Sequence, residues 1–175
     1  LELLDKIKIS SKDINCIGIS GGKTKDFPNE IDEIRIIQVP EVEAIGRGAK
    51  KNFEIEDSFL AMSLGTGTGC IFGDKDNNYQ YIGGIPVGGG TLIGLSKLLL
   101  NETNIESISK LANAGDRSVV DFLIKDVVSG INILKPNLSA SNFAKVSEGI
   151  HRKEDISKAL TNMIGEIIGL SLIHI

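Results

Sequence analysis

Two glycine-rich clusters restrict the fold of this chain more than any other feature of its sequence. Residues 63–69 read Ser-Leu-Gly-Thr-Gly-Thr-Gly, and residues 83–91 read Gly-Gly-Ile-Pro-Val-Gly-Gly-Gly-Thr. Glycine lets one backbone segment come close to another group and adopts conformations with positive φ. Between the clusters, the apolar segments 70–72 and 79–82 flank a Gly-Asp-Lys-Asp-Asn-Asn turn, which predicts a hairpin. We therefore expect two glycine loops separated by one hairpin.

The first cluster has the composition of an anion-binding turn. Successive backbone N–H groups in such a turn form a concave site for phosphate oxygens, and the threonine hydroxyls can contact the same oxygens. The expected nucleotide contacts are Gly65, Thr66, Gly67 and Thr68. An ordinary hairpin turn is the alternative, although a hairpin needs fewer glycine and threonine residues than this segment has.

The second cluster leads directly into residues 91–100, which are expected to form a helix. The N-terminus of a helix carries a partial positive charge and unpaired N–H groups, so it favours phosphate. The expected contacts are Gly88, Gly89, Gly90 and Thr91. A dinucleotide-binding βαβ unit fits less well, because the segment after this helix is again expected to be helical. The two loops together predict a site for nucleotide phosphates.

A shorter glycine cluster near the N-terminus is similar to a Walker A loop but does not match it. In Gly18-Ile-Ser-Gly-Gly-Lys-Thr24, three residues separate Gly18 from Gly22, whereas the motif needs four at that place. The shortfall favours a strand followed by a tight turn, with Lys23 and Lys25 in solvent.

The remaining pattern predicts a mixed α/β chain with a helical second half. Strands are expected at 15–20, 34–39 and 59–64, and surface loops at 73–78 and 135–137. The expected helices are Glu41–Asn52, 91–100, Ile105–Ala114, 116–128, one that begins near Ser139, and a last one from Ile156 with apolar residues at helical spacing.

Composition excludes several classes of function. The net charge is −4, only 5% of residues are aromatic and there is no Trp, so no nucleic-acid partner is expected. The run that comes nearest to a membrane span, residues 156–175, contains Lys158 and Glu166, so we expect no membrane span and interpret this run as a buried amphipathic helix. No signal peptide is visible, which predicts a cytoplasmic protein. Cys16 and Cys70 are expected to be small buried residues, and two histidines leave little for a zinc site.

Taken in order, these motifs resemble the type II (eukaryotic-like) pantothenate kinases. The resemblance rests on Gly-Thr-Gly-Thr at 65–68, a hairpin, and a Gly-Gly-x-x-x-Gly-Gly-Gly loop at 83–90 that opens a helix with Gly-Leu and Leu-Leu. It continues through Ala-Gly-Asp-Arg at 114–117, Asp121 and Leu-Ser-Ala-Ser-Asn-Phe at 138–143. Upstream, Ile-Ser-Gly-Gly at 19–22 fits the family's strand and Gly-Gly element. The resemblance thus covers nearly the whole chain.

The resemblance implies an α/β fold of the actin-like ATPase (ribonuclease H-like) type, incomplete, with part of both lobes and a helical second half. Residues 1–64 would be the remainder of the N-terminal α/β lobe. Residues 65–175 would be the truncated start of the C-terminal lobe, with its glycine loops and helices.

The resemblance also implies an activity, namely ATP-dependent phosphorylation of pantothenate to 4′-phosphopantothenate, the first step of coenzyme A biosynthesis. ATP and Mg²⁺ are the implied cofactors, no metal ligand is assigned in the chain, and a homodimer is implied. The position that matches the family's catalytic carboxylate is Glu41, as general base on the substrate hydroxyl. Considered without the resemblance, Glu41 is a first-turn carboxylate favoured by the helix dipole. Asp116 and Arg117 are expected to cap and brace a helix, outside the catalytic set.

Three departures from the family keep other interpretations open. The family's Asp-x-Gly-Gly-Thr phosphate hairpin is expected upstream of Leu1, and the last part of the second lobe is absent, so residues 1–175 alone are expected to be inactive. The family usually has Arg where this chain has Tyr81. The alternatives are a kinase of the same fold for another small hydroxylated substrate, such as an amino sugar, and a non-catalytic regulator that binds nucleotide or coenzyme A.

Overall fold

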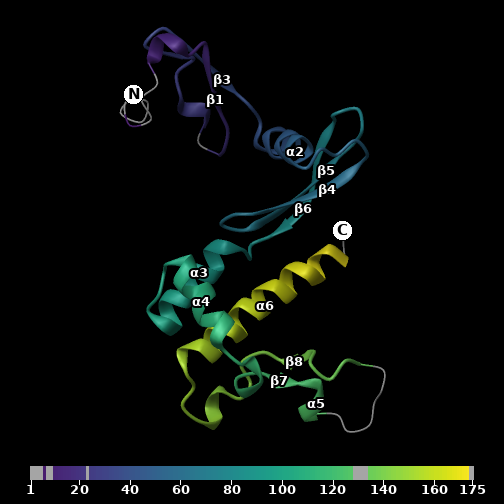
Figure 1. The fold of residues 1–175 in the computed structure, drawn as a ribbon. Coiled ribbons are helices and arrows are strands. Elements are labelled where there is room, and N and C mark those ends of the chain that lie inside the picture. Colours follow the sequence, from purple (N-terminus) through teal and green to yellow (C-terminus); the bar gives the residue numbers. More distant parts are fainter. Residues whose placement is uncertain (1–5, 7–9, 23, 128–133, 174–175) are drawn as a thin grey trace. The chain divides into compact units, whose positions relative to one another are not determined.

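The computed structural model describes residues 6, 10–22, 24–127 and 134–173. The chain divides into two compact units, which we describe separately. Unit 1 contains the described residues of Leu1–Ser63 and Cys70–Ile82, and unit 2 contains those of Leu64–Gly69 and Gly83–Ile175. The described residues form a mixed α/β structure with three small sheets and five α-helices (Figure 1).

The elements that begin in unit 1 are, in chain order, η1 (Ser11–Asp13), β1 (Cys16–Ile19), η2 (Thr24–Asp26), β2 (Glu30–Ile31), β3 (Ile34–Gln38), α2 (Glu41–Asn52), β4 (Phe59–Leu64) and β6 (Tyr79–Ile85). The elements that begin in unit 2 are β5 (Thr68–Gly73), α3 (Gly89–Leu100), α4 (Ile105–Ala114), η3 (Arg117–Val119), β7 (Phe122–Leu123), α5 (Ile124–Val127), β8 (Ser139–Ser141), η4 (Val146–Glu148) and α6 (Lys153–Ile173).

The first sheet has the strand order β1-β3-β2, with β1 and β3 parallel and β2 antiparallel to β3. Ile34 and Ile36 of β3 are buried, and the amide of Val39 donates to the carbonyl of Ile19 at 2.9 Å. This bond continues the parallel pairing of β1 with β3 by one residue, to Val39. The carboxyl ends of β1 and β3 therefore lie side by side. Pro40 and α2 come directly after the end of β3.

Helix α2 packs on the second sheet, whose strand order is β4-β5-β6. Gly46 lies against the ring of Tyr79, because a Cβ placed there would be 2.2 Å from that ring. The amine of Lys50 donates to the carbonyl of Lys75 at 2.9 Å, in the turn between β5 and β6. Gly46 and Lys50 thus hold this helix on the hairpin of β5 and β6.

Unit 2 has a core between three helices, and Figure 1 shows α3 and α4 beside the N-terminal part of α6. Its buried apolar side chains are Leu100, Ile108, Ala112, Ala159, Leu160 and Ile164. The hydroxyl of Ser157 on α6 donates to the carbonyl of Ile108 on α4 at 2.9 Å. At the end of α4, a Cβ on Gly115 would lie 2.0 Å from the carbonyl oxygen of Glu154. This close approach fixes the start of α6 against the end of α4.

Helix α6 is long and apolar enough to cross a membrane by length and composition alone. One such helix is weak support for a membrane span, because the core helix of a folded domain has the same properties. Only 22% of its most apolar 18-residue window is buried, and the exposed apolar residues gather near its C-terminal end. The expected helix from Ile156 exists and begins three residues earlier, at Lys153, but the expectation that it is buried holds only for its N-terminal part, which packs on α3 and α4.

The expected helix over 116–128 is wrong for the residues up to 127. The chain instead forms η3, the short strand β7 and the four-residue helix α5. The reason is non-local, because Phe122 and Leu123 pair with Ser141 and Ser139 of β8. Tertiary pairing here overrides the local helical pattern. Residue 128 lies outside the described residues.

The helix expected to begin near Ser139 is also wrong, since this segment is strand β8 followed by a turn and η4. The hydroxyl of Ser139 does not cap a helix. It donates to the carboxylate of Glu166 on α6 at 2.8 Å and accepts from the guanidinium of Arg117.

The two cysteines differ from the expectation that both are buried. Cys70 on β5 is 1% exposed, and burial raises the pKa of its thiol. Cys16 is exposed, because the four-residue strand β1 alternates between exposed and half-buried positions and Cys16 lies on the exposed side. Both thiols are free.

Candidate functional site

The two glycine clusters meet directly in unit 2. The amide of Gly90 donates to the carbonyl of Thr66 at 3.1 Å and is also 3.4 Å from that of Gly65. A Cβ on Gly88 would lie 2.6 Å from the carbonyl carbon and oxygen of Gly67, and a Cβ on Gly90 would lie 2.8 Å from the carbonyl oxygen of Thr66. These contacts are backbone against backbone, so no side-chain rotation can relieve them. Gly88 and Gly90 are therefore required by the packing of one loop on the other, whatever ligand the loops bind.

The loop between β6 and α3 is shorter than the second glycine cluster of the sequence, residues 83–91. Strand β6 extends through Gly83 and Gly84 to Ile85, and α3 begins at Gly89, so only residues 86–88 lie between the two elements. The amide of Gly88 donates to the hydroxyl of Thr91 at 3.3 Å, which fixes the entry to the helix. The bond from Gly90 to Thr66 thus holds the N-terminus of α3 against the first loop.

The two threonines of the first loop have different surroundings. Thr68 is buried, and its hydroxyl donates to the carbonyl of Val87 at 2.8 Å, which ties β5 to the second loop. Thr66 is exposed, and within the described residues its hydroxyl has no hydrogen-bond partner. The amide of Gly65 donates to the carbonyl of Gly67 at 2.9 Å, whereas the described residues offer the amides of Thr66 and Gly67 no backbone acceptor. Thr66 and Gly67 are therefore the part of this loop that is open to a ligand.

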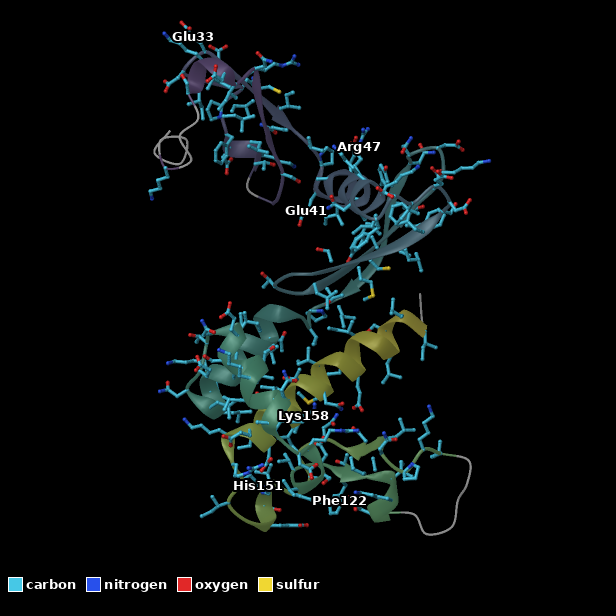
Figure 2. The ribbon with its side chains drawn as sticks, viewed as in Figure 1. Glu33, Glu41, Arg47, Phe122, His151 and Lys158 are labelled. Carbon is cyan, nitrogen blue, oxygen red and sulfur yellow. The ribbon has the colours of Figure 1, made fainter. Side chains whose placement is uncertain are left out.

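Glu41 is the first residue of α2 and follows Pro40 at the end of β3. Proline suits a position before a helix, since it has no N–H to leave unpaired, and a carboxylate in the first turn is stabilised by the helix dipole. Figure 2 labels Glu41 at this end of α2 and Arg47 further along the same helix. The Glu41 side chain is exposed.

Glu41 lines a pocket of about 430 Å³ at the carboxyl ends of the parallel strands β1 and β3. Ligands of open α/β sheets bind at this edge of the sheet. The lining residues are Gly21, Gly22, Thr24, Lys25, Gln38, Val39, Pro40 and Glu41. The Gly-Gly turn that follows β1 and the expected catalytic carboxylate therefore lie on one pocket of unit 1, while the glycine loops belong to unit 2.

The neighbouring carboxylate, Glu43, does not compete for this role. It accepts from Arg47 one turn further along α2, with 2.8 Å between the carboxylate and the guanidinium. Glu43 is also absent from the lining of the pocket. Glu41 and Glu43, two residues apart on α2, thus have different surroundings.

The segment 18–24 does not form a phosphate-binding Walker A loop. Gly18 is inside β1, and the turn leads into η2, a 3₁₀ helix of three residues, instead of a long helix. Gly21 has a φ of 120°, a conformation that side chains disfavour, so glycine is required at this turn. The expected tight turn is confirmed. Lys23 lies outside the described residues.

Arg117 and Asp121 form a buried link between segments that are distant in sequence. Arg117 donates to the carbonyl of Asn137 and to Ser139, and its guanidinium lies 3.5 Å from Asp121 and 3.7 Å from Glu166. Asp121 is fully buried and accepts from the amide of Phe143 at 2.8 Å. Phe143 has a φ of 59°, which non-glycine residues seldom adopt. The bond from Asp121 holds the backbone in this conformation.

Asp116 caps η3, since its carboxylate accepts from the amide and the hydroxyl of Ser118, both at 2.9 Å. These two bonds lower the pKa of Asp116 below its ordinary value. Asp116 therefore has the capping role that the sequence predicted. Arg117 braces β8 and α6 as well as its own helix.

The sequence model of one protein family, Fumble, matches residues 43–173 of the chain. The chain belongs to the Fumble family.

Three curated relatives of this Fumble family chain are named type II pantothenate kinase. The Bacillus cereus protein is 34% identical over 177 residues, which are 95% of this chain and 63% of the relative. The Bacillus anthracis protein is 32% identical over 178 residues, with the same shares covered. The Oceanobacillus iheyensis protein is 31% identical over 157 residues, or 86% of this chain and 57% of the relative. The chain thus spans about three fifths of the length of these relatives.

Thr24 and Lys25 line the Glu41 pocket of this Fumble family chain, a connection that the sequence pattern did not indicate. Lys25 is exposed, as expected, and also lines the pocket. The signal that could have found them is the order of elements, since residues that follow two adjacent parallel strands meet at one edge of the sheet. Tyr81, at the position expected to be Arg in the family, lies on β6 and is 55% exposed.

Proposed function

We propose that the full-length gene product transfers the γ-phosphoryl group of ATP to the hydroxyl of pantothenate and so forms 4′-phosphopantothenate, the first step of coenzyme A biosynthesis. Membership in the Fumble family and the names of the curated relatives support this proposal. The single observation that carries it is the position of Glu41, on a pocket at the carboxyl ends of two parallel strands.

The chemistry divides between the two groups of residues. Glu41 accepts the proton of the substrate hydroxyl. The oxygen of this hydroxyl forms a bond to the γ-phosphorus of ATP while the bond between the γ-phosphorus and the β-γ bridging oxygen breaks. The open amides of Thr66 and Gly67, the Thr66 hydroxyl and the N-terminus of α3 hold phosphate oxygens. Gly65, Thr68, Gly88, Gly89, Gly90 and Thr91 complete the proposed ATP-binding set, with Gly88, Gly90 and Thr68 acting by shaping the loops.

Mg²⁺ is proposed to enter bound to the phosphates of ATP. Among the described residues, no group of three His, Cys, Asp or Glu side chains is placed to hold a metal ion. Magnesium commonly keeps several waters and binds through substrate phosphates with few protein ligands. When bound there, Mg²⁺ neutralises charge on the transferring phosphate.

The proposed fold of the whole protein has two lobes of the actin-like, ribonuclease H-like type. Residues 1–64 would belong to the N-terminal lobe and residues 65–175 to the C-terminal lobe. We also propose a homodimer in the cytoplasm, supported by the family resemblance.

The test is ATP-dependent phosphorylation of pantothenate by the full-length gene product and by its Glu41→Gln variant. Loss of a general base lowers kcat by about 10²- to 10⁴-fold. Glu43→Gln is the matched control, because it makes the same change two residues away, on a side chain that is paired with Arg47. An active Glu41→Gln enzyme, or an equal loss in Glu43→Gln, would rule out the assigned base.

A second candidate is a kinase of the same fold that acts on another small hydroxylated substrate, such as an amino sugar. The observation that favours it is Tyr81, where the family resemblance expects Arg. Parallel assays with pantothenate and an amino sugar decide between the two, because the better substrate by kcat/KM is the one for which the pocket is built.

A further inference from the structure

The pocket beside Glu41 contains a cation that has no assigned role. Lys25 is the single lysine or arginine among its described lining residues. The described residues form five ion pairs, and neither Lys25 nor Glu41 takes part in any of them. Both side chains are exposed. A positive and a negative group thus line one pocket, each without a protein partner within the described part of the chain.

The backbone that carries Lys25 is anchored on the turn that follows β1. The amide and the hydroxyl of Thr24 both bond to the carbonyl of Gly21, at 3.3 and 2.9 Å. The amide of Phe27 then donates to the carbonyl of Thr24 at 3.2 Å. Lys25 lies in η2 between these bonds, so the turn fixes where its side chain begins. An exposed lysine on an anchored turn has no packing role to explain its place at the pocket.

We propose that the ammonium group of Lys25 binds an anionic oxygen group of a substrate of the reaction in the pocket that Glu41 lines. This inference rests on the proposed function and adds a binding residue to it. Two groups of the reaction have the required chemistry, the carboxylate of pantothenate and the phosphate of ATP. A lysine suits either one, since it is a compact point charge with three rotatable donors on a flexible stem. Gln38, from the end of β3, supplies a neutral polar group to the same pocket.

The experiment measures steady-state kinetics of the full-length gene product with two substrates, pantothenate and an N-alkyl amide of pantothenate that lacks the carboxylate. The variants are Lys25→Gln, which removes the charge, and Lys25→Arg, which restores a charge with different geometry. Lys12→Gln is the matched control, because Lys12 is exposed in the same unit and does not line the pocket. All variants are checked for an unchanged thermal midpoint.

If Lys25 holds the carboxylate, Lys25→Gln raises KM for pantothenate by roughly 10- to 100-fold with kcat little changed, and leaves the amide unaffected. If it holds phosphate, Lys25→Gln raises KM for ATP or lowers kcat by a similar factor with both substrates. Either result supports the inference and identifies the anion, and Lys25→Arg should recover part of the loss. Unchanged KM and kcat in Lys25→Gln would overturn it.

Titration calorimetry with pantothenate and with inorganic phosphate separates failure of this inference from failure of the proposed function. If the wild-type protein does not phosphorylate pantothenate, the proposed function fails by itself. An affinity for either probe that falls at least 10-fold in Lys25→Gln would still support the inference. Equal affinities of wild type and Lys25→Gln, or no binding of either probe, would refute it.

Discussion

A single methyl group at Gly88 should separate the two glycine loops. Gly88→Ala places a Cβ 2.6 Å from the carbonyl carbon and oxygen of Gly67, whereas ordinary contact begins at 3.4 Å. One loop must therefore move by about 0.8 Å or more. Overpacking of this kind costs about 1–3 kcal/mol. The shift also strains the bond from Gly90 to Thr66, and a hydrogen bond contributes about 1 kcal/mol. We expect a loss of about 2–4 kcal/mol in the free energy of unfolding.

Gly94→Ala is the matched control for this substitution. Gly94 lies further along α3, and nothing is within 4 Å of a Cβ built there. Alanine in a helix interior is better than glycine by about 0.5–1 kcal/mol, so this variant should be slightly more stable than wild type. The two variants make the same chemical change, one at the N-cap of α3 and one inside this helix, with opposite expected signs.

The assay is urea unfolding followed by circular dichroism, without nucleotide, and then ATP binding by titration calorimetry. Gly88→Ala should unfold at a lower urea concentration than wild type even with no ligand present, because the clash is within the protein. If Gly88→Ala were as stable as wild type, the direct backbone contact between the loops would be refuted. The importance of Gly88 would then have to come from a ligand alone.

Three other predictions concern acid stability, a buried link and substrate choice. The bond from Arg152 to Asp155 is the main cause that lowers the pKa of Asp155, so ionised Asp155 stabilises the fold above its unfolded pKa of about 3.9. That stability is lost as pH falls through the folded-state pKa, and Asp155→Asn should weaken the pH dependence of the urea midpoint between about pH 5 and pH 2. Asp121→Ala, which leaves the guanidinium of Arg117 without its buried partner, should cost about 3–5 kcal/mol in unfolding, and a midpoint equal to wild type would contradict the link. Tyr81→Arg should lower KM for pantothenate if the protein uses the cation of its family at this position, and an unchanged or raised KM in the kinase assay would count against it.

Local pattern was sufficient for the elements that position the candidate site. Helix α2 begins and ends where the sequence predicted, at Glu41 and Asn52, directly after Pro40. The hairpin of β5 and β6 was predicted from its turn residues, and Asp74 does organise this turn by accepting from the amides of Asp76 and Asn78. In these segments the information is contained within a few consecutive residues.

Prediction failed where distant segments decide the structure. The pattern after Asp116 is compatible with a helix, yet Phe122 and Leu123 pair with β8 and Asp121 bonds to the amide of Phe143. The sequence of residues 116–128 does not indicate that these residues pair with residues 139–143. The same holds for the Glu41 pocket, since Lys25 joins it only through the parallel pairing of β1 and β3. These predictions failed because local sequence does not reveal long-range pairing, and not because residue preferences were misjudged.

The two threonines of the first glycine loop separate what the fold needs from what a ligand needs. The sequence gives Thr66 and Thr68 the same neighbours, but the structure buries Thr68 with a bond to Val87 and leaves Thr66 exposed. Thr68→Val should therefore lower the free energy of unfolding by about 1–3 kcal/mol, because the carbonyl of Val87 loses its donor. Thr66→Val should stay within about 0.5 kcal/mol of wild type in stability.

Nucleotide affinity should respond in a different order from stability. A hydrogen bond to a charged group contributes about 1.5–3 kcal/mol, so Thr66→Val should weaken ATP binding by roughly 10- to 100-fold while its urea midpoint is unchanged. Titration calorimetry of both variants with ATP, beside their urea curves, checks this. If Thr66→Val binds ATP as tightly as wild type, its hydroxyl does not contact phosphate. Phosphate binding in this loop would then have to rest on the amides of Thr66 and Gly67 and on the N-terminus of α3.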